Sequence, residues 1–185
     1  MAVKIKIDSR AGKALGFKTV NGKLVRSTSS LVPEVRKEFR RIGPKSIRQK
    51  LLQNVRAGLS PVDGKGRFKK YSKGYRDEIR RARSKRMREA NPKKRPTKVT
   101  LNLSGTLHRS LKLFTSGGFT ETFKLVFDWD NFLADIHNNL GAGKSKIVRR
   151  ILPTKKGETF NESINDEILL KLNNAAKNVI RKFFL

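Results

Sequence analysis

The chain has 185 residues, which is enough for one ordinary domain with its own core or for one small domain that carries extended arms. Apolar residues make up only 36 % of it, and the formal charge of +29 implies an anionic partner, because so much like charge repels itself. The absence of cysteine excludes disulfides and thiolate chemistry, and two histidines leave little for a metal centre. We therefore expect no metal and no cofactor.

No segment approaches the roughly 20 apolar residues that span a bilayer. The N-terminus alternates charged and aliphatic residues, unlike the apolar core of a signal peptide. We expect a protein that has no membrane partner and is soluble and cytosolic when it is made.

The positive charge is unevenly distributed. Residues 1–98 hold 31 basic and 7 acidic side chains (net +24), residues 99–141 hold 3 and 4 (net −1), and residues 142–185 hold 10 and 4 (net +6). The nearly neutral middle is the expected sheet-forming core, with basic material before and after it.

Residues 1–30 are expected to form a strand and hairpin arm. Val3, Ile5 and Ile7 alternate with lysines, as in an edge or half-buried strand. Asn21-Gly22 separates two strand-like runs and predicts a type I′ hairpin. Either this segment joins the sheet or it serves as an interaction arm.

A long helix is predicted from Leu31 to Val55, with Ser30 as a possible cap. Its apolar residues fall at helical spacing: Leu31, Val35, Phe39, Ile42, Ile47, Leu51 and Val55. Because Gly43-Pro44 interrupts the run, we expect either a kinked helix or two helices that meet there.

A turn-rich basic loop follows, and residues 60–98 are predicted to be a basic arm. Tyr75 to Ala90 has helical spacing but only a narrow apolar side, too small to anchor it in a core. Asn91-Pro92 and Pro96 end this helix.

The apolar pattern then changes to strand spacing. Val99, Leu101 and Leu103 alternate with other residues, and Ser116-Gly117-Gly118 is expected to form a turn. After the turn, apolar residues return on one face: Phe119, Phe123, Leu125 and Phe127. This pattern predicts an antiparallel hairpin. A short helix follows, capped by Asn131, stopped by Gly141 and carrying Phe132, Leu133, Ile136 and Leu140 on its apolar side.

The segment "KIVRRILP" is expected to be a last strand that ends at Pro153. The C-terminal helix is the clearest element of the pattern, with an apolar stripe formed by Ile164, Ile168, Leu172, Ala175, Val179 and Phe183. This stripe serves either the core or a subunit contact. The predicted fold class is α+β: a small antiparallel sheet with a long N-terminal helix and a C-terminal helix, plus the extended basic arm, with residues 31–184 forming one domain.

The segment "GAGKS" at residues 141–145 resembles the end of a phosphate-binding P-loop. The first glycine of that motif would fall on Asn138, and the residues before it look helical where a buried strand is required. A basic glycine-rich loop is therefore the preferred interpretation.

The remaining candidates for catalytic residues do not form a recognisable active site. His108 and His137 each lie among apolar neighbours, where a histidine is more often structural than catalytic. Asp128 and Asp130 flank Trp129, a spacing equally common in plain turns. Since no nucleophile, base and orienting group occur together, we expect no enzyme.

Sixteen Lys or Arg residues lie between Lys65 and Lys98, against Asp77, Glu78 and Glu89, which favours an anionic partner over a salt-bridged surface helix. Phe68, Tyr71 and Tyr75 could stack on bases, but contact with the nucleic-acid backbone through charge is the simpler account. The candidate contacts with nucleic acid or an acidic partner are Arg80, Arg81, Arg83, Lys85, Arg86, Arg88, Lys93, Lys94 and Arg95.

The second half of the chain contains three segments of interest, which follow one another as "LSGTLHRSLKLF" (103–114), "WDNFLADIHNNLGAG" (129–143) and "IVRRILPTKKGETFNESINDEI" (147–168). In this order they resemble motifs of the tail-completion or virion-morphogenesis proteins of tailed bacteriophages, in the Mu-like branch. The matching residues are Ser104, Gly105, Leu107, Ser110 and Leu111, then Phe132, Ala134, His137 and Gly141, then Arg150, Ile151 and Leu152.

This resemblance implies a non-enzymatic protein of the virion neck. It implies a ring, commonly six-fold, between the head connector and the tail proteins, with double-stranded DNA passing through it. Duplex DNA carries about one charge per 1.7 Å, so a lumen on the order of 30 Å tall faces only about 18 phosphates. Sixteen cations per subunit exceed that need, so we expect much of the arm to dock on acidic surfaces of neighbouring proteins.

A ribosomal or other RNA-binding protein is the alternative, because high positive charge and basic arms are equally natural there. The sequence shows no RNP, KH or double-stranded-RNA signature, and the three ordered motifs favour the phage interpretation.

Overall fold

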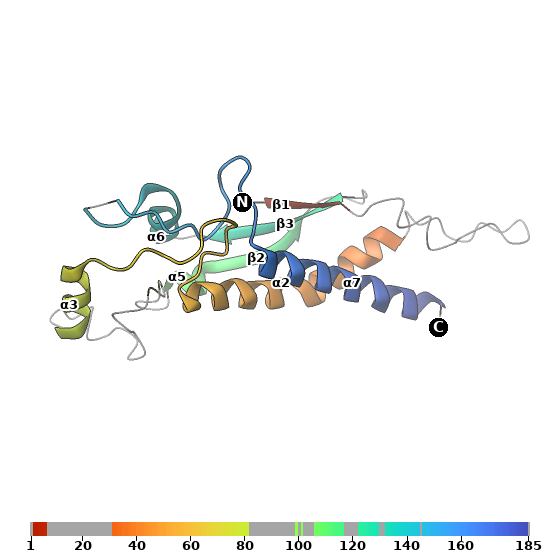
Figure 1. The fold of residues 1–185 in the computed structure, drawn as a ribbon. Coiled ribbons are helices and arrows are strands. Elements are labelled where there is room, and N and C mark those ends of the chain that lie inside the picture. The colour runs from red at the N-terminus through yellow and green to blue at the C-terminus, as the bar shows by residue number, and fades with distance from the viewer. Residues whose placement is uncertain are drawn as a thin grey trace, which may run out of the picture. The chain divides into compact units, whose positions relative to one another are not determined.

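The computed structural model describes residues 2–6, 31–81, 99, 101, 106–116, 122–129, 132–144 and 146–184. They form an α+β structure with a long N-terminal helix, a small antiparallel sheet and a long C-terminal helix, which confirms the predicted fold class (Figure 1). The chain divides into two compact units. The first comprises residues 1–47, 113–127 and 166–185, and the second comprises residues 48–112 and 128–165.

Helix α2 runs from Leu31 to Ala57 without a break, so Gly43-Pro44 does not divide it into two helices. Its buried side chains recur at helical spacing, among them Phe39, Ile47 and Leu51. A Cβ on Gly43 would lie 2.9 Å from the ring of Phe39. The glycine therefore provides room for this ring inside the helix instead of ending it.

The sheet has the strand order β1-β3-β2. Strand β1 (Ala2–Lys6) pairs antiparallel with β3 (Thr122–Trp129), from Ala2 opposite Val126 to Lys6 opposite Thr122. Strand β2 (Leu111–Ser116) lies on the other side of β3, as the predicted hairpin requires. Residues 2–6 thus join the sheet as an edge strand, whereas the predicted hairpin at Asn21-Gly22 lies outside the described residues.

Helix α7 (Glu162–Phe184) confirms the predicted C-terminal helix. Ile168, Ala175 and Val179 are buried and Leu172 is half-buried, so the stripe serves the core, while the side chain of Phe183 lies outside the described residues. In the first unit α7 packs along α2 (Figure 1). The side-chain amide of Asn178 donates a 2.9 Å hydrogen bond to Glu38, and the Ser46 hydroxyl donates one to Glu167.

The second unit contains α3 (Lys73–Arg81), α5 (Thr106–Ser110), α6 (Phe132–Asp135) and the π-helical turn η2 (Ile136–Leu140). Helix α3 starts two residues before the predicted Tyr75. No described helix in either unit is long and apolar enough to cross a membrane.

Two sequence predictions about strands in this unit are wrong. Residues 148–153 contain no strand, and only an isolated bridge pairs Ala142 with Ile147. Val99 and Leu101 are buried but belong to no strand, and Leu101 has a φ of 50°, outside the β region. Their alternation reflects burial at individual positions and not a sheet ladder.

The predicted apolar side of the α6 to η2 segment is also wrong. Phe132 is 73 % exposed and Leu140 is 56 % exposed, whereas Ala134 and Asn138 are buried. Ala134 and Asn138 lie four positions apart, as ordinary helical spacing allows, but the buried face carries a small and a polar residue in place of the predicted large apolar ones. Gly141 ends the segment as predicted, with a φ of 84°.

Candidate nucleic-acid and partner interface

The loop after α2 is anchored in the second unit. Val62 bridges to Phe160, the backbone N–H of Phe68 donates to the carbonyl of Gly58 at 2.9 Å, and the Ser60 hydroxyl donates to the carbonyl of Arg150 at 2.7 Å. Ser60, Pro61, Val62 and Phe68 are buried. The expectation that a free basic arm begins at residue 60 is therefore wrong for residues 60–68, because apolar side chains attach this stretch to the core.

The same loop continues into a strip of basic side chains, residues 65–81, which we call the basic strip. Its exposed cationic residues are Lys65, Arg67, Lys69, Lys70, Lys73, Arg80 and Arg81. Arg80 pairs with Asp77 at 3.7 Å, and Lys65 lies 4.0 Å from Glu158. Among the described residues, the remaining exposed cations of the strip form no ion pair with a carboxylate. Their charge is available to a partner.

Arg149 holds the backbone of the basic strip from inside the unit. Its Nε donates to the carbonyl of Lys69 at 3.2 Å and its Nη2 to the carbonyl of Lys70 at 3.5 Å. The guanidinium carbon lies 5.3 Å from the ring centre of Tyr71, which meets Tyr75 edge to face at 5.0 Å. Only 4 % of Arg149 is exposed, and burial lowers the pKa of its guanidinium. Sequence reasoning missed this anchor, because it joins residues about 80 positions apart.

The three aromatics predicted as candidates for base stacking are used within the fold in different ways. Phe68 is only 8 % exposed, so its ring is not available to a base and that prediction is wrong. Tyr71 and Tyr75 are half-buried, with Arg149 against Tyr71. Contact with a nucleic-acid backbone through charge stays a prediction for this surface.

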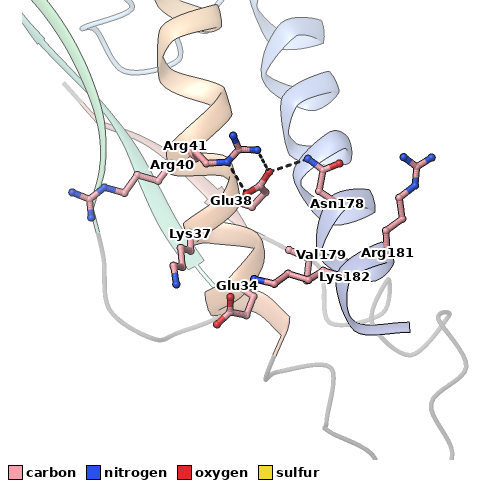
Figure 2. A pocket seen from close by; sticks show the side chains of 9 residues that line it. All are labelled: Glu34, Lys37, Glu38, Arg40, Arg41, Asn178, Val179, Arg181 and Lys182. Atoms are coloured by element: carbon pink, nitrogen blue, oxygen red, sulfur yellow. Dashed lines mark hydrogen bonds and ion pairs between the residues drawn. The ribbon is translucent and has the colours of Figure 1, made fainter. Parts of the chain in front are cut away.

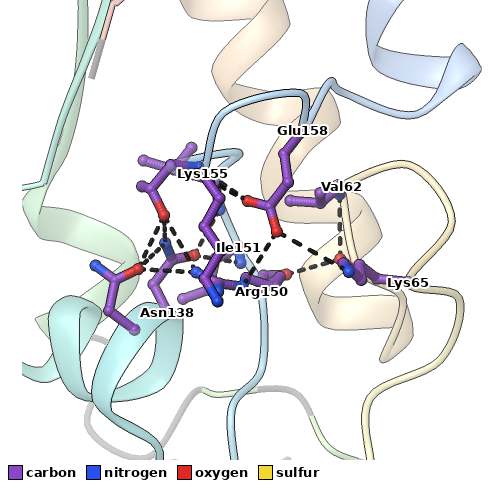
Figure 3. Close-up of polar contacts among 11 residues, drawn as sticks. Val62, Lys65, Asn138, Arg150, Ile151, Lys155 and Glu158 are labelled. Carbon is purple, nitrogen blue, oxygen red and sulfur yellow. Dashed lines mark hydrogen bonds and ion pairs between the residues drawn. The ribbon is translucent and has the colours of Figure 1, made fainter.

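A buried asparagine connects the α6 to η2 segment to residues 151–154 (Figure 3). The side-chain oxygen of Asn138 accepts hydrogen bonds from the backbone N–H groups of Ile151 and Leu152, at 2.7 and 2.8 Å. Its amide nitrogen donates to Asn139 and Thr154 at 3.2 and 3.1 Å. All four bonds of a primary amide are satisfied, as a buried polar group requires.

Arg150 and Glu158 form an ion pair beside this asparagine, with 3.4 Å between Arg150 Nε and Glu158 Oε1 (Figure 3). Burial raises the pKa of Glu158, but hydrogen bonds from the backbone N–H groups of Lys155 and Thr154 and the charge of Arg150 outweigh it, so the pKa lies below its usual value. The carboxylate stays charged and fixes the 154–158 turn next to Lys65.

The first family-like motif is held through its backbone carbonyls. Trp129 Nε1 donates to the carbonyl of Leu107, and the Arg48 guanidinium donates to the carbonyls of His108 and Leu111 at 2.7 and 2.8 Å. Leu107 and His108 are buried. These bonds satisfy carbonyls at the end of the short helix α5, which is a structural role.

Residues 141–147 do not have the geometry of a P-loop. The N–H of Gly141 donates to the carbonyl of Ile136 at 2.7 Å, and that of Ala142 donates to Ile147 at 2.9 Å. In a P-loop these backbone N–H groups would point at phosphate. A tight basic turn is what remains, in agreement with the preferred interpretation of the sequence.

The predicted site residues are only partly described. Arg80 and Arg81 end α3 and are exposed, His137 lies half-buried in η2, and Gly141 stops that turn. The residues outside the described part of the chain are Arg83, Lys85, Arg86, Arg88, Lys93, Lys94, Arg95, Ser104 and Gly105. Among the described residues, no group of three or more His, Asp or Glu side chains is placed to hold a metal ion.

Comparison with protein-family models, with curated proteins and with solved structures gives no match to this chain. The contacts and charges described above are therefore the basis of any functional assignment.

Proposed function

We propose that the protein is a non-enzymatic structural component of the neck of a tailed bacteriophage, where it completes the tail or joins it to the head. The single observation that carries the anionic-partner part of this proposal is the basic strip, whose exposed cations other than Lys65 and Arg80 lack carboxylate partners among the described residues. The order of the three family-like motifs along the chain supports the placement in the neck.

The geometry of the strip suits the phosphate backbone of duplex DNA. Arg149 fixes the carbonyls of Lys69 and Lys70 while the side chains of these lysines remain exposed. A fixed backbone with mobile cationic side chains contacts phosphates without reading bases. Binding of this kind does not depend on the base sequence of the DNA, and its affinity falls steeply as the salt concentration rises.

The remaining parts of the proposal concern assembly. In it, copies of the chain form a ring, commonly six-fold in the family that the sequence resembles, between the head connector and the tail proteins. Double-stranded DNA passes through the ring, and the arm of residues 80–98 docks on acidic surfaces of the neighbouring proteins. The protein is found in the virion neck and, during assembly, in the host cytoplasm.

DNA binding is tested by the salt dependence of affinity for a short duplex. Replacing Lys69, Lys70 and Lys73 by Gln removes three cations of the strip. The slope of log affinity against log salt is expected to fall in magnitude by about 2 to 3, since each phosphate contact contributes about 0.9. Replacing Lys112, Lys155 and Lys156 by Gln is the matched control, because these exposed lysines lie outside the strip. Equal slopes for both variants would refute the assignment of the strip.

The neck assignment is tested by light scattering on size-separated, nuclease-treated protein. A discrete ring, or insertion into connector-tail complexes, is the expected result. A monomer that binds structured RNA tightly at high salt would identify an RNA-binding protein instead.

Deleting residues 80–98 should abolish ring or particle assembly while leaving the free energy of unfolding of the monomer unchanged. If the shortened chain does not fold, those residues belong to the core and the docking part of the proposal is wrong.

A further inference from the structure

A groove of about 870 Å³ lies between α2 and α7 within the first unit (Figure 2). It lies apart in sequence from the basic strip, because its lining comes from residues 34–41 and 178–182. Five cations line it, three from α2 and two from α7: Lys37, Arg40, Arg41, Arg181 and Lys182.

One of the two carboxylates in the groove is fully used by its neighbours. Glu38 accepts two hydrogen bonds from Arg41, at 3.0 and 2.6 Å, and one from Asn178 at 2.9 Å. The bond from Arg41 and then that from Asn178 lower the pKa of Glu38 to about 2. Glu38 therefore stays ionised; Arg41 is its ion-pair partner, and the charge of Lys182 also lowers its pKa.

The other four cations are in excess over the second carboxylate, Glu34. None of the four forms an ion pair with a described carboxylate, and all four are exposed. Figure 2 shows Lys182 extending from α7 towards α2, whereas Lys37 and Arg40 extend from α2 on the side away from α7. Positive charge thus lies between the helices at Lys182 and on the outer side of α2 at Lys37 and Arg40, while Val179 contributes a buried apolar side chain to the lining.

The size and charge of the groove select its occupant. Five lining cations against two lining carboxylates favour an anionic occupant. Axes of packed helices lie about 8–10 Å apart, which is less than the roughly 12 Å width of the major groove alone in duplex DNA. A duplex therefore does not enter this space. Carboxylate side chains do, and the apolar floor at Val179 suits an aliphatic neighbour of those carboxylates.

We propose that this groove docks an acidic segment of a partner protein, with carboxylates of that segment on Lys37, Arg40, Arg181 and Lys182. The surface goes beyond the proposed contact with DNA and is independent of it, because it uses other residues in the other unit. It would give the chain a protein-docking site on its helices and a nucleic-acid site on its basic strip.

The first test measures the affinity of the full chain for a fluorescent oligoglutamate peptide at about 0.15 M salt. Replacing Lys37 and Lys182 by Gln should weaken binding about tenfold, or about 1.4 kcal/mol, which is in the range of two exposed ion pairs. Replacing Lys155 and Lys156 by Gln removes the same charge from the other unit and should change the affinity less than about twofold. If the two variants behave alike, the peptide binds by net charge only and the proposal fails. Unfolding in urea checks that both variants remain folded.

The second test locates the peptide by photo-crosslinking with a photoreactive oligoglutamate. Crosslinks in residues 34–41 and 178–182 are the expected result. Crosslinks confined to residues 65–81 would overturn the proposal. Competition with a short duplex is the further control: loss of the groove crosslinks when duplex is added would mean that the groove takes nucleic acid. The strip variant at Lys69, Lys70 and Lys73 should retain the groove crosslinks even where its DNA binding is lost, so the two proposals fail separately.

Discussion

The side-chain oxygen of Asn138 lies 2.7 Å from the backbone nitrogen of Ile151 and accepts its hydrogen bond in the interior of the second unit. The N–H of Leu152 donates to the same oxygen. The sequence predicts this segment as a strand, but its backbone N–H groups donate to one side-chain oxygen instead of to the carbonyls of a neighbouring strand. Asn138 replaces a sheet partner at this position.

Replacing Asn138 by Ala should lower the free energy of unfolding by about 2–4 kcal/mol, because two buried backbone N–H groups lose their acceptor. Urea denaturation measures this loss. Asn173→Ala is the matched control on the exposed side of α7 and should change stability by less than about 0.5 kcal/mol. Similar losses for the two variants would mean that water replaces the asparagine.

Gly141 and Gly157 have almost the same positive φ, 84° and 83°, but different surroundings. A Cβ on Gly157 would meet nothing within 4 Å, whereas a Cβ on Gly141 would overlap the backbone carbonyl of Lys146. Gly157→Ala should therefore cost about 1–2 kcal/mol, the price of the left-handed conformation alone. Gly141→Ala should cost distinctly more, or prevent folding.

Thermal unfolding of both variants measures this difference directly. Gly141 combines its positive φ with a ψ of 141°, outside the left-handed helical region, so the excess reports this conformation together with the clash with the 142–147 turn. Equal melting temperatures would show that the turn moves aside without cost.

Phe68 and Phe132 are two phenylalanines with opposite environments, 8 % and 73 % exposed. Phe68→Ala should lower the free energy of unfolding by about 3–5 kcal/mol, the usual loss for a buried aromatic. Phe132→Ala should change it by less than about 0.5 kcal/mol, since most of its ring is already in water. A small effect at Phe68 would place the loop outside the core and restore the longer arm that the sequence predicts.

His137 is expected to make stability depend on pH. Burial and then the charge of Arg149 lower its pKa to about 4, from an ordinary value of 6.5. The unfolded chain therefore binds a proton that the folded chain does not take up until lower pH. Stability should fall as pH drops from about 6.5 to 4, by about 3 kcal/mol in total.

Chemical denaturation across this pH range measures the effect, and His137→Gln should flatten the curve there. The loss of stability below about pH 4.5 should remain in that variant, because it comes from Glu38. The pKa of this carboxyl is about 2 in the folded chain, so its stabilising bonds to Arg41 and Asn178 are lost as the pH falls from 4.5 towards 2. A wild-type curve that is already flat between pH 6.5 and 4 would show that the imidazole is protonated in the folded state.

The sequence predicts those elements whose pattern is local and regular. The C-terminal helix follows from apolar residues such as Ile168, Ala175 and Val179, because helical spacing places them on one face. The edge strand at residues 2–6 and the hairpin strands follow from alternation, as in Leu125 and Phe127.

The predictions fail where one residue acts on a distant segment. Asn138 lies four positions after Ala134, on the face that becomes buried, but a polar residue among apolar ones is normally assigned to the surface. Phe68 lies in a glycine-rich basic loop, where nothing local indicates burial. Both side chains are buried by partners that lie elsewhere in the chain.

Spacing and composition are enough to predict the α+β class, the two long helices and the segregation of positive charge, because they act over neighbouring residues. The tertiary structure alone decided which loop joins the core, which face of the α6 to η2 segment is buried and which cations keep free charge. The physical reason is that burial and hydrogen-bond satisfaction depend on groups far apart in the chain, as Arg149 and the carbonyl of Lys69 demonstrate.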